Sequence, residues 1–457
     1  MLNNNYEMNI IIIILLIALV SILFFVSKAK KWQEKIVIIF LLGGTAIYGG
    51  IGISMTSVDN SYILSFASFI ICEGVGLMLG HKMFETDLID RRNFITDIAS
   101  SKDLISFFAI IYWLIILILL VYPTNHIKDL FSIRIDLNGV IASRIAKRSD
   151  VVLYVLGLLS KIASPFYCIF LSKQRNKIII VFLLLEAYIN TAIDGYIGRT
   201  AIMMLLIEVI LVTFLINNAE KSYKKHIIFN LPRIKTVRKG SDINTQNTYR
   251  IKKAILIFLI GFIVAIPFLV SYQYSRQGKS YVGGGFTEAF LFLADSEINY
   301  PQYYEACENL KGQVISPLEY LYWFITLPIP KELFSLPGTT SITYTFSSII
   351  RGISFGETGF SVLLTSLLGE GIMIWGKHLC FIHGIFIGLV WGAINSFLTE
   401  NKELYLYQIL FIARTLNMVR GGTQGSISTI INGIIPFVVI CFVTSNIAKS
   451  SSRSKII

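Results

Sequence analysis

Long apolar stretches separated by short polar connections make up most of the chain. Each stretch approaches the roughly 18 residues that a helix needs to cross a bilayer. Because apolar residues run on without a two-residue alternation, the pattern predicts helices and not the strands of a membrane barrel. The twelve stretches are 9–26, 36–54, 62–80, 105–123, 150–171, 177–193, 200–217, 253–272, 360–376, 379–398, 404–418 and 429–446.

One polar interruption, residues 273–357, is far longer than the others. Acidic residues outnumber basic ones in it, and since cytoplasmic loops favour Lys and Arg, this balance predicts the non-cytoplasmic side. A transporter rarely needs such a loop, whereas a membrane enzyme that works on the far face does. The acids are Glu288, Asp295, Glu297, Glu305, Glu308, Glu319, Glu332 and Glu357, and the bases are Arg276, Lys279, Lys311, Lys331 and Arg351.

The basic connections predict the orientation. Lys28–Lys35, the segment 173–177 and the segment 217–253, with ten bases against two acids, fall on one side if every stretch spans. The positive-inside rule makes that side cytoplasmic. Twelve full spans would leave the basic C-terminal tail outside, so we favour a re-entrant segment at 404–428, which returns the tail to the inside.

Composition supports a polytopic membrane protein. The chain of 457 residues is 54% hydrophobic and 15% charged, with a mean hydropathy of +0.68, which excludes an ordinary soluble domain. The net charge of +12 therefore reports topology, and we expect no nucleic-acid partner.

We accordingly expect an all-α polytopic membrane protein with about 11–12 transmembrane helices and one large periplasmic loop. The predicted parts are an N-terminal membrane bundle at 1–272, with eight spans and a basic cytoplasmic loop at 217–252, the large loop at 273–357, and C-terminal membrane helices at 358–457.

Apparent signatures of other chemistry are weak here. Gly352–Gly356 match G-x-S-x-G, but that motif needs a strand–turn–helix elbow in an α/β sheet. Asp295 and Glu297 form a D-x-E pair, which in an acidic loop is more often solvated than metal-bound. The five cysteines are scattered without a C-x-x-C pair, and we expect neither a metal nor a cofactor.

Arginines near the predicted outer ends of spans form the main cationic feature. Guanidinium groups bind phosphate oxygens through two parallel hydrogen bonds, and such contacts strengthen at the edge of low-dielectric lipid. The cluster suits a lipid pyrophosphate, although headgroup contact by scattered arginines explains it too. The candidates are Arg199, Arg276, Arg351, Arg414 and Arg420.

Several short motifs resemble those of bacterial O-antigen polymerases of the Wzy type. Residues 327–332 (LPIPKE) end the large loop, and residues 367–376 (LLGEGIMIWG) carry a Glu before an aromatic–Gly pair. Gly198–Arg199 open a span, Ser275–Arg276 begin the large loop, and Arg420–Gly421 precede the last span.

The resemblance implies polymerisation of undecaprenyl-pyrophosphate-linked oligosaccharide repeat units in lipopolysaccharide biosynthesis, at the periplasmic face of the bacterial inner membrane. The growing chain would be transferred to the incoming unit, and a chain-length regulator protein is a further implied partner. Such a transferase needs cations on the pyrophosphate and a base for the acceptor hydroxyl. For the base we favour Glu370, with Asp194 or Glu357 behind it.

Two alternatives stay open. An O-antigen ligase or other lipid-dependent glycosyltransferase shares the layout and would be favoured by an outer histidine base, for which only His126 is available. A flippase or polysaccharide exporter should show two similar halves and short outer loops, which this chain lacks.

Overall fold

The structure is a computed structural model that describes residues 2–50, 53, 59–83, 95, 101–122, 125–130, 150–174, 176–194, 201, 204–213, 303–329, 341–357, 360 and 362–454. Within these ranges all regular structure is helical. The helices are α1 (Leu2–Lys28), α2 (Trp32–Thr45), η1 (Ala46–Gly50), α4 (Ser61–Met83), α6 (Lys102–Val121), η2 (His126–Leu130), α8 (Val151–Ser172), α9 (Asn176–Asp194), α14 (Tyr303–Asn309), α15 (Pro317–Ile325), α16 (Ile342–Arg351), α17 (Leu367–Trp375), α18 (Cys380–Glu400), η3 (Lys402–Leu404), α19 (Tyr405–Gly421) and α20 (Thr423–Ser454).

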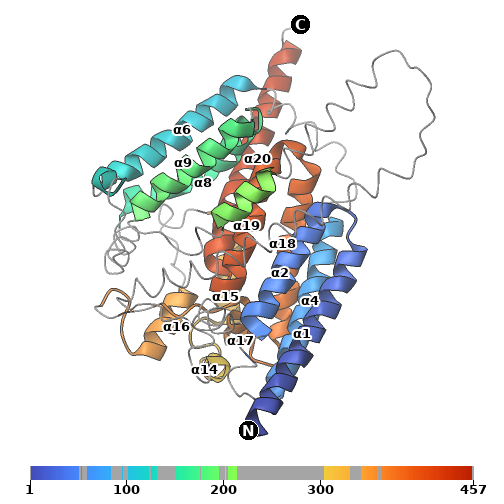
Figure 1. The fold of residues 1–457 in the computed structure, drawn as a ribbon. Helices are drawn as coiled ribbons and strands as arrows, with labels where there is room; N and C mark the ends of the chain where they lie inside the picture. Colours follow the sequence, from blue (N-terminus) through green and yellow to red (C-terminus); the bar gives the residue numbers. More distant parts are fainter. Residues whose placement is uncertain are drawn as a thin grey trace, which may run out of the picture. The chain divides into compact units, whose positions relative to one another are not determined.

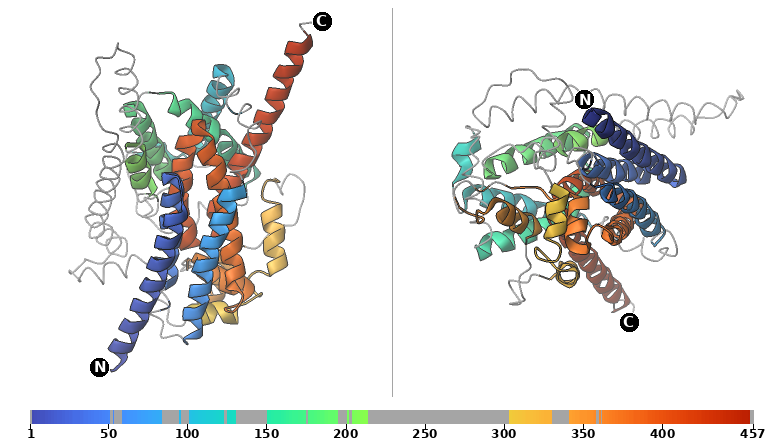
Figure 2. Two further views of the ribbon diagram at one scale, coloured as in Figure 1. Left: turned by 90° about the vertical axis from the view of Figure 1, so that its right-hand side faces the viewer. Right: turned by 90° about the horizontal axis from the view of Figure 1, so that it is seen from below.

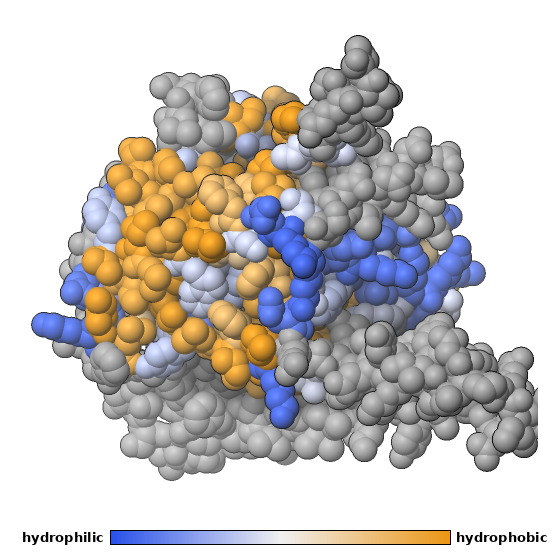
Figure 3. Space-filling model, turned by 90° about the horizontal axis from the view of Figure 1, so that it is seen from above, coloured by the Kyte–Doolittle hydropathy of each residue, from blue (hydrophilic) through white to orange (hydrophobic). Residues whose placement is uncertain are grey.

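Five helices of the described part are long and apolar enough to cross a membrane. They are α4, α6, α8, α18 and the stretch Thr423–Ile447 of α20. Each coincides with an apolar stretch of the sequence, so the prediction of an α-helical membrane protein is confirmed at this level. In Figure 3, apolar residues occupy a large part of the coloured surface, as expected for helices whose outer sides meet lipid.

The chain divides into two compact units. The first comprises Met1–Gln174, Tyr188–Ile197 and Ala294–Ile457, and the second comprises Arg175–Ala187 and Gly198–Leu293. Of the second unit, the structure describes the first part of α9 and the short apolar helix Met204–Thr213.

In the first unit, α1, α2, α4 and α18 lie side by side (Figure 1 and Figure 2). The closest pair is α4 with α18, because glycines on each helix face the backbone of the other. A Cβ on Gly384 would lie 2.7 Å from the carbonyl oxygen of Phe69, and one on Gly80 would lie 2.6 Å from the nitrogen of Ala393. Small residues such as these let two helix backbones approach closely.

Contacts along this seam show that α4 and α18 run in the same direction. Gly384 faces Phe69, and Gly392 faces Leu77. At the far end of α18, Glu400 forms an ion pair with Lys31, which precedes α2. His383 and Glu400 are 17 positions apart, or about 25 Å along a helix. We call the two ends of this bundle the Glu370 end and the Lys31 end.

A second group of helices is built around α8, which packs against α6, α19 and α20. Phe166 of α8 stacks on Phe108 of α6 at 4.1 Å between ring centroids and meets Phe437 of α20 edge-on at 4.8 Å. These rings supply large apolar contact area and fix the helices in register.

The apolar stretch 360–376 is not a span, which corrects the sequence prediction. Its helix, α17, has nine residues, about 14 Å of rise against a hydrocarbon core of about 30 Å. Ser366 begins the helix by accepting a hydrogen bond from the Gly369 nitrogen at 3.1 Å, and Gly376 ends it with φ +84°. A serine cap at one end and a glycine cap at the other make the segment a short buried helix.

The last two long helices, α19 and α20, determine where the chain leads after α18. α19 runs back along α18, since Gln408 bonds to Asn395 at 3.0 Å and Trp391 bonds to Thr415 at 2.9 Å. It therefore leads from the Lys31 end to the Glu370 end, and α20 leads away again (Figure 1). With α17 too short to cross, returning the basic tail to the side of Lys31 no longer requires a re-entrant segment at 404–428, which stays a prediction.

Candidate functional site

Glu370 is the predicted base, and its carboxyl group lies buried where α17 meets the turn between α19 and α20. The side chain is 1% exposed. Its Oε2 accepts a hydrogen bond from the backbone nitrogen of Thr423 at 2.7 Å, and its Oε1 accepts one from the Thr423 hydroxyl. Two donors from one residue hold the carboxyl group in a single orientation.

Tyr320 extends this hydrogen-bond chain. Its hydroxyl lies 2.9 Å from the Thr423 hydroxyl oxygen, and its ring is fully buried. Tyr320 belongs to α15, which Ser316 caps by accepting from the Glu319 nitrogen. Tyr320 lies within the large polar loop, and its burial shows a packing and hydrogen-bonding role.

His383 stands on the other side of Glu370. Its Nε2 lies 3.9 Å from Glu370 Oε1, and its side chain has no exposed surface. The Tyr320 ring meets the imidazole edge-on at 5.3 Å between centroids. Neither imidazole nitrogen has a hydrogen-bond partner.

Segments from the large polar loop and its C-terminal continuation cover the site. The backbone nitrogen of Ile342, at the start of α16, donates to the Gln424 side chain at 2.9 Å. The Thr343 hydroxyl donates to the Gly421 carbonyl at 3.3 Å. The turn itself needs glycine, because Gly422 has φ +83° and a Cβ there would collide with the Glu370 carboxylate.

Burial raises the pKa of Glu370 to about 7, against the lowering effect of the Thr423 side-chain and backbone hydrogen bonds. Desolvation disfavours the charged form, whereas donors to the carboxylate favour it. The balance leaves a group that gains and loses protons near neutral pH. A general base works best with such a pKa.

Of the other two predicted bases, the structure describes the side chain of Glu357 alone. Asp194 is the last residue of α9, and its side chain lies outside the described residues. Glu357 is exposed and accepts a hydrogen bond from the Ser354 backbone nitrogen at 3.0 Å. Glu357 therefore stabilises its own turn.

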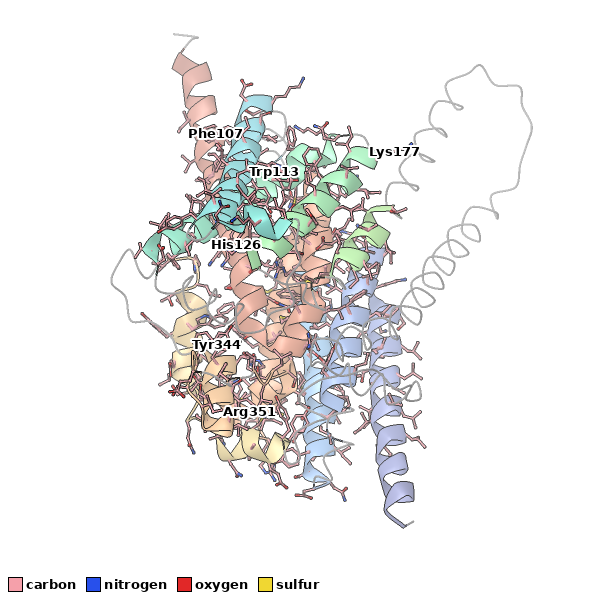
Figure 4. The ribbon with its side chains drawn as sticks, turned by 60° about the vertical axis from the view of Figure 1, so that its left-hand side comes forward. Phe107, Trp113, His126, Lys177, Tyr344 and Arg351 are labelled. Atoms are coloured by element: carbon pink, nitrogen blue, oxygen red, sulfur yellow. The ribbon has the colours of Figure 1, made fainter. Side chains whose placement is uncertain are left out.

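The predicted arginines are only partly gathered. Arg420 lies in the last turn of α19, and its carbonyl oxygen accepts from the Ser366 nitrogen at 3.2 Å. Arg351 is exposed at the end of α16, on the same short helix as Tyr344 and well apart from His126 in Figure 4.

Arg414 lies further along α19, close enough to Lys161 of α8 for their charges to repel. Arg199 and Arg276 lie outside the described residues.

Sequence reasoning missed both Thr423 and His383. It counted the stretch 360–376 as a crossing. Since α17 does not cross, His383 begins α18 at the same end as Glu370. The available signals were the polar pair Thr365–Ser366 and the glycines around Glu370, which interrupt the apolar stretch.

Comparisons with models of known protein families, with curated proteins and with solved structures find no match for this chain. Its class therefore rests on its own residues. The described helices define an α-helical membrane protein with a buried carboxyl site at one end of a helix bundle.

Proposed function

We propose that this protein is a glycosyltransferase that joins undecaprenyl-pyrophosphate-linked oligosaccharide repeat units, as an O-antigen polymerase does. The observation that carries the proposal is Glu370, a buried carboxyl group oriented by Thr423 at the end of the bundle opposite Lys31. With the basic connection around Lys31 in the cytoplasm, this end faces outward. The motif around Glu370 is also the one in which the sequence resembles these polymerases.

The proposed reaction needs one base and one anion site. A hydroxyl group of the incoming unit attacks the anomeric carbon of the growing chain and gives its proton to the Glu370 carboxylate. The bond between that carbon and the pyrophosphate oxygen breaks, and the lipid pyrophosphate leaves with the bonding electrons. A pKa of about 7 suits Glu370 for this proton transfer.

Arginines would hold the leaving group. Arg420 is adjacent to the turn that bonds Glu370, and Arg351 ends the helix that packs on this turn. Their charges would stabilise the pyrophosphate as negative charge develops on it. Arg414, Arg199 and Arg276 remain candidates for the same role.

Substrate must reach a carboxyl group that is now covered. Tyr320 and the start of α16 form part of the cover, and both belong to the large polar loop. We propose that the binding of substrate displaces them and that the acceptor hydroxyl takes the hydrogen-bonding place of Thr423 Oγ1.

An O-antigen ligase is the second candidate, and His383 is the observation that favours it. The sequence analysis found His126 as the only outer histidine, whereas the structure places His383 beside Glu370. A ligase would use the same lipid donor and deliver the glycan to the lipid A core.

The test is a gel of surface polysaccharide from a bacterial strain that lacks this gene. For a polymerase we expect lipid A core with a single repeat unit, because flipping and ligation survive. Core without any repeat unit would contradict polymerisation and would indicate a ligase or a flippase.

Complementation with variants then tests the site. E370Q should leave the strain with single units and fail to restore long chains, because the loss of a general base lowers the rate of polymerisation about 10²- to 10⁴-fold. The matched control is E73Q, which makes the same change at a second fully buried glutamate, hydrogen-bonded to Thr45 in the bundle. Long chains from E370Q at normal membrane abundance would remove Glu370 from the mechanism.

A further inference from the structure

His383 is a buried histidine whose two ring nitrogens have no hydrogen-bond partner. A neutral imidazole always carries one N–H and one acceptor nitrogen. Leaving such groups unpaired in a dry interior is costly, and native structures rarely do so without a functional reason. The site therefore contains an unused hydrogen-bonding capacity directly beside Glu370.

The packing around the ring aims this capacity at one atom. A Cβ on Gly371 would lie 3.3 Å from His383 Cβ, so the glycine is what allows the histidine to approach α17. Phe69 and Tyr320 flank the ring at 6.3 and 5.3 Å between centroids. The polar atom that the ring faces is Glu370 Oε1, 3.9 Å from Nε2. A movement of about 1 Å would bring the two atoms to hydrogen-bond distance.

Glu370 has room for this additional donor. An ionised carboxylate offers about four acceptor positions, and Thr423 occupies one on each oxygen. When Glu370 is protonated it needs fewer donors. Ionisation places a full negative charge beside the imidazole and attracts its N–H.

We propose that His383 is the positioning residue for Glu370: its Nε2–H turns to donate to Oε1 when the carboxyl group ionises, and so holds the carboxylate charged and aimed. The pairing rests on the geometry alone, whereas its purpose, keeping a base ready within a buried site, rests on the proposed function. The acceptor hydroxyl can then displace Thr423 Oγ1 without leaving Oε1 unsupported.

Other titratable groups lie on the elements that pack against α17. They include Tyr320 of α15, Tyr303 of α14, Arg420 of α19 and His383 of α18. The Tyr303 hydroxyl donates to the Leu364 carbonyl at 3.1 Å. The hydrogen-bond chain from Tyr320 to Glu370 passes through Thr423.

The test measures the protonation of Glu370 directly. Purified full-length protein in lipid nanodiscs is titrated with pH while its carboxyl stretching band is followed by infrared difference spectroscopy, and E370Q identifies the band. H383F keeps the ring and removes the donor, so the ionised form loses a partner. We expect the midpoint of Glu370 to rise by about one pH unit, a tenfold change in proton affinity.

Two further variants distinguish the loss of the His383–Glu370 hydrogen bond from a general loosening of the helix packing. H383Q retains an N–H donor and should shift the midpoint of Glu370 less than H383F does. If H383F does not fold, H383Q is the variant whose midpoint is measured. H81F removes the other buried histidine of the bundle, which bonds to Asn395, and should leave the midpoint unchanged. The acid limb of polymerisation should move by the same amount as the infrared midpoint in each variant.

These readouts distinguish the two proposals. A raised midpoint in a protein that polymerises nothing would support the pair and contradict the proposed function. An unchanged midpoint of Glu370 in H383F would contradict the pairing of His383 with Glu370, even if polymerisation were intact. Equal shifts in H81F and H383F would likewise show loosened packing and remove His383 from this role.

Discussion

Replacing Gly388 by alanine should break the closest helix contact in the bundle. A Cβ at this position would lie 2.8 Å from the backbone nitrogen of Leu77 and 3.0 Å from the carbonyl carbon of Glu73, with the Glu73 carbonyl oxygen nearer still. These are backbone atoms of α4, so no flexible side chain can give way. α4 and α18 must move apart, and the neighbouring glycine contacts are lost with them.

The magnitude follows from overpacking. Inserting a methyl group into a well-packed contact costs about 1–3 kcal/mol, and the rigid backbone of α4 favours the upper part of that range. The matched control is Gly157→Ala in α8, where a new Cβ would meet nothing within 4 Å. Alanine is the better helix former by roughly 0.5–1 kcal/mol, so this variant should be slightly more stable than the wild type.

The free energy of unfolding of both variants is measured at equilibrium in mixed micelles, as the proportion of denaturing detergent is increased. We expect the free energy of unfolding of Gly388→Ala to fall below that of Gly157→Ala by about 2–4 kcal/mol. Equal unfolding midpoints for the two variants would refute the reasoning, because they would show that α4 and α18 do not approach as closely as the glycine seam requires.

Three further predictions concern the site and the opposite end of the bundle. Gly422→Ala should abolish polysaccharide polymerisation in the complementation assay, because its φ of +83° strains alanine and its Cβ would collide with Glu370; normal chains from this variant would contradict the turn geometry. Thr423→Val removes the hydroxyl donor from Glu370, so the pKa of Glu370 should rise above about 7 and the acid limb of the pH–rate profile should move to higher pH, with Thr423→Ser as the control that retains the donor. Lys31→Met should lower the free energy of unfolding by less than about 1 kcal/mol, since its ion pair with Glu400 is partly exposed, and a larger loss in micelle unfolding would show that the pair is desolvated.

Much of the architecture follows from local pattern. The stretches 62–80, 105–123, 150–171, 379–398 and 429–446 become α4, α6, α8, α18 and α20, because an uninterrupted apolar segment satisfies its backbone hydrogen bonds only as a helix. The glycines of α4 indicated a close contact for the same local reason, since small residues leave the backbone accessible. Glu370 could also be singled out, as an acid within an apolar stretch is costly without a role.

Tertiary structure decided which of these features meet. The stretch 360–376 is as apolar as a span, but Ser366 and Gly376 cap it after nine residues, and hydropathy averaged over a window cannot register such ends. That difference brings His383 to the same end as Glu370. Thr423 reaches the carboxyl group from 53 positions away, through a glycine turn between two helices. Partners so distant in sequence leave no local pattern. Composition alone therefore determined the class of protein, and the packing of α17 against the α19–α20 turn built its candidate site.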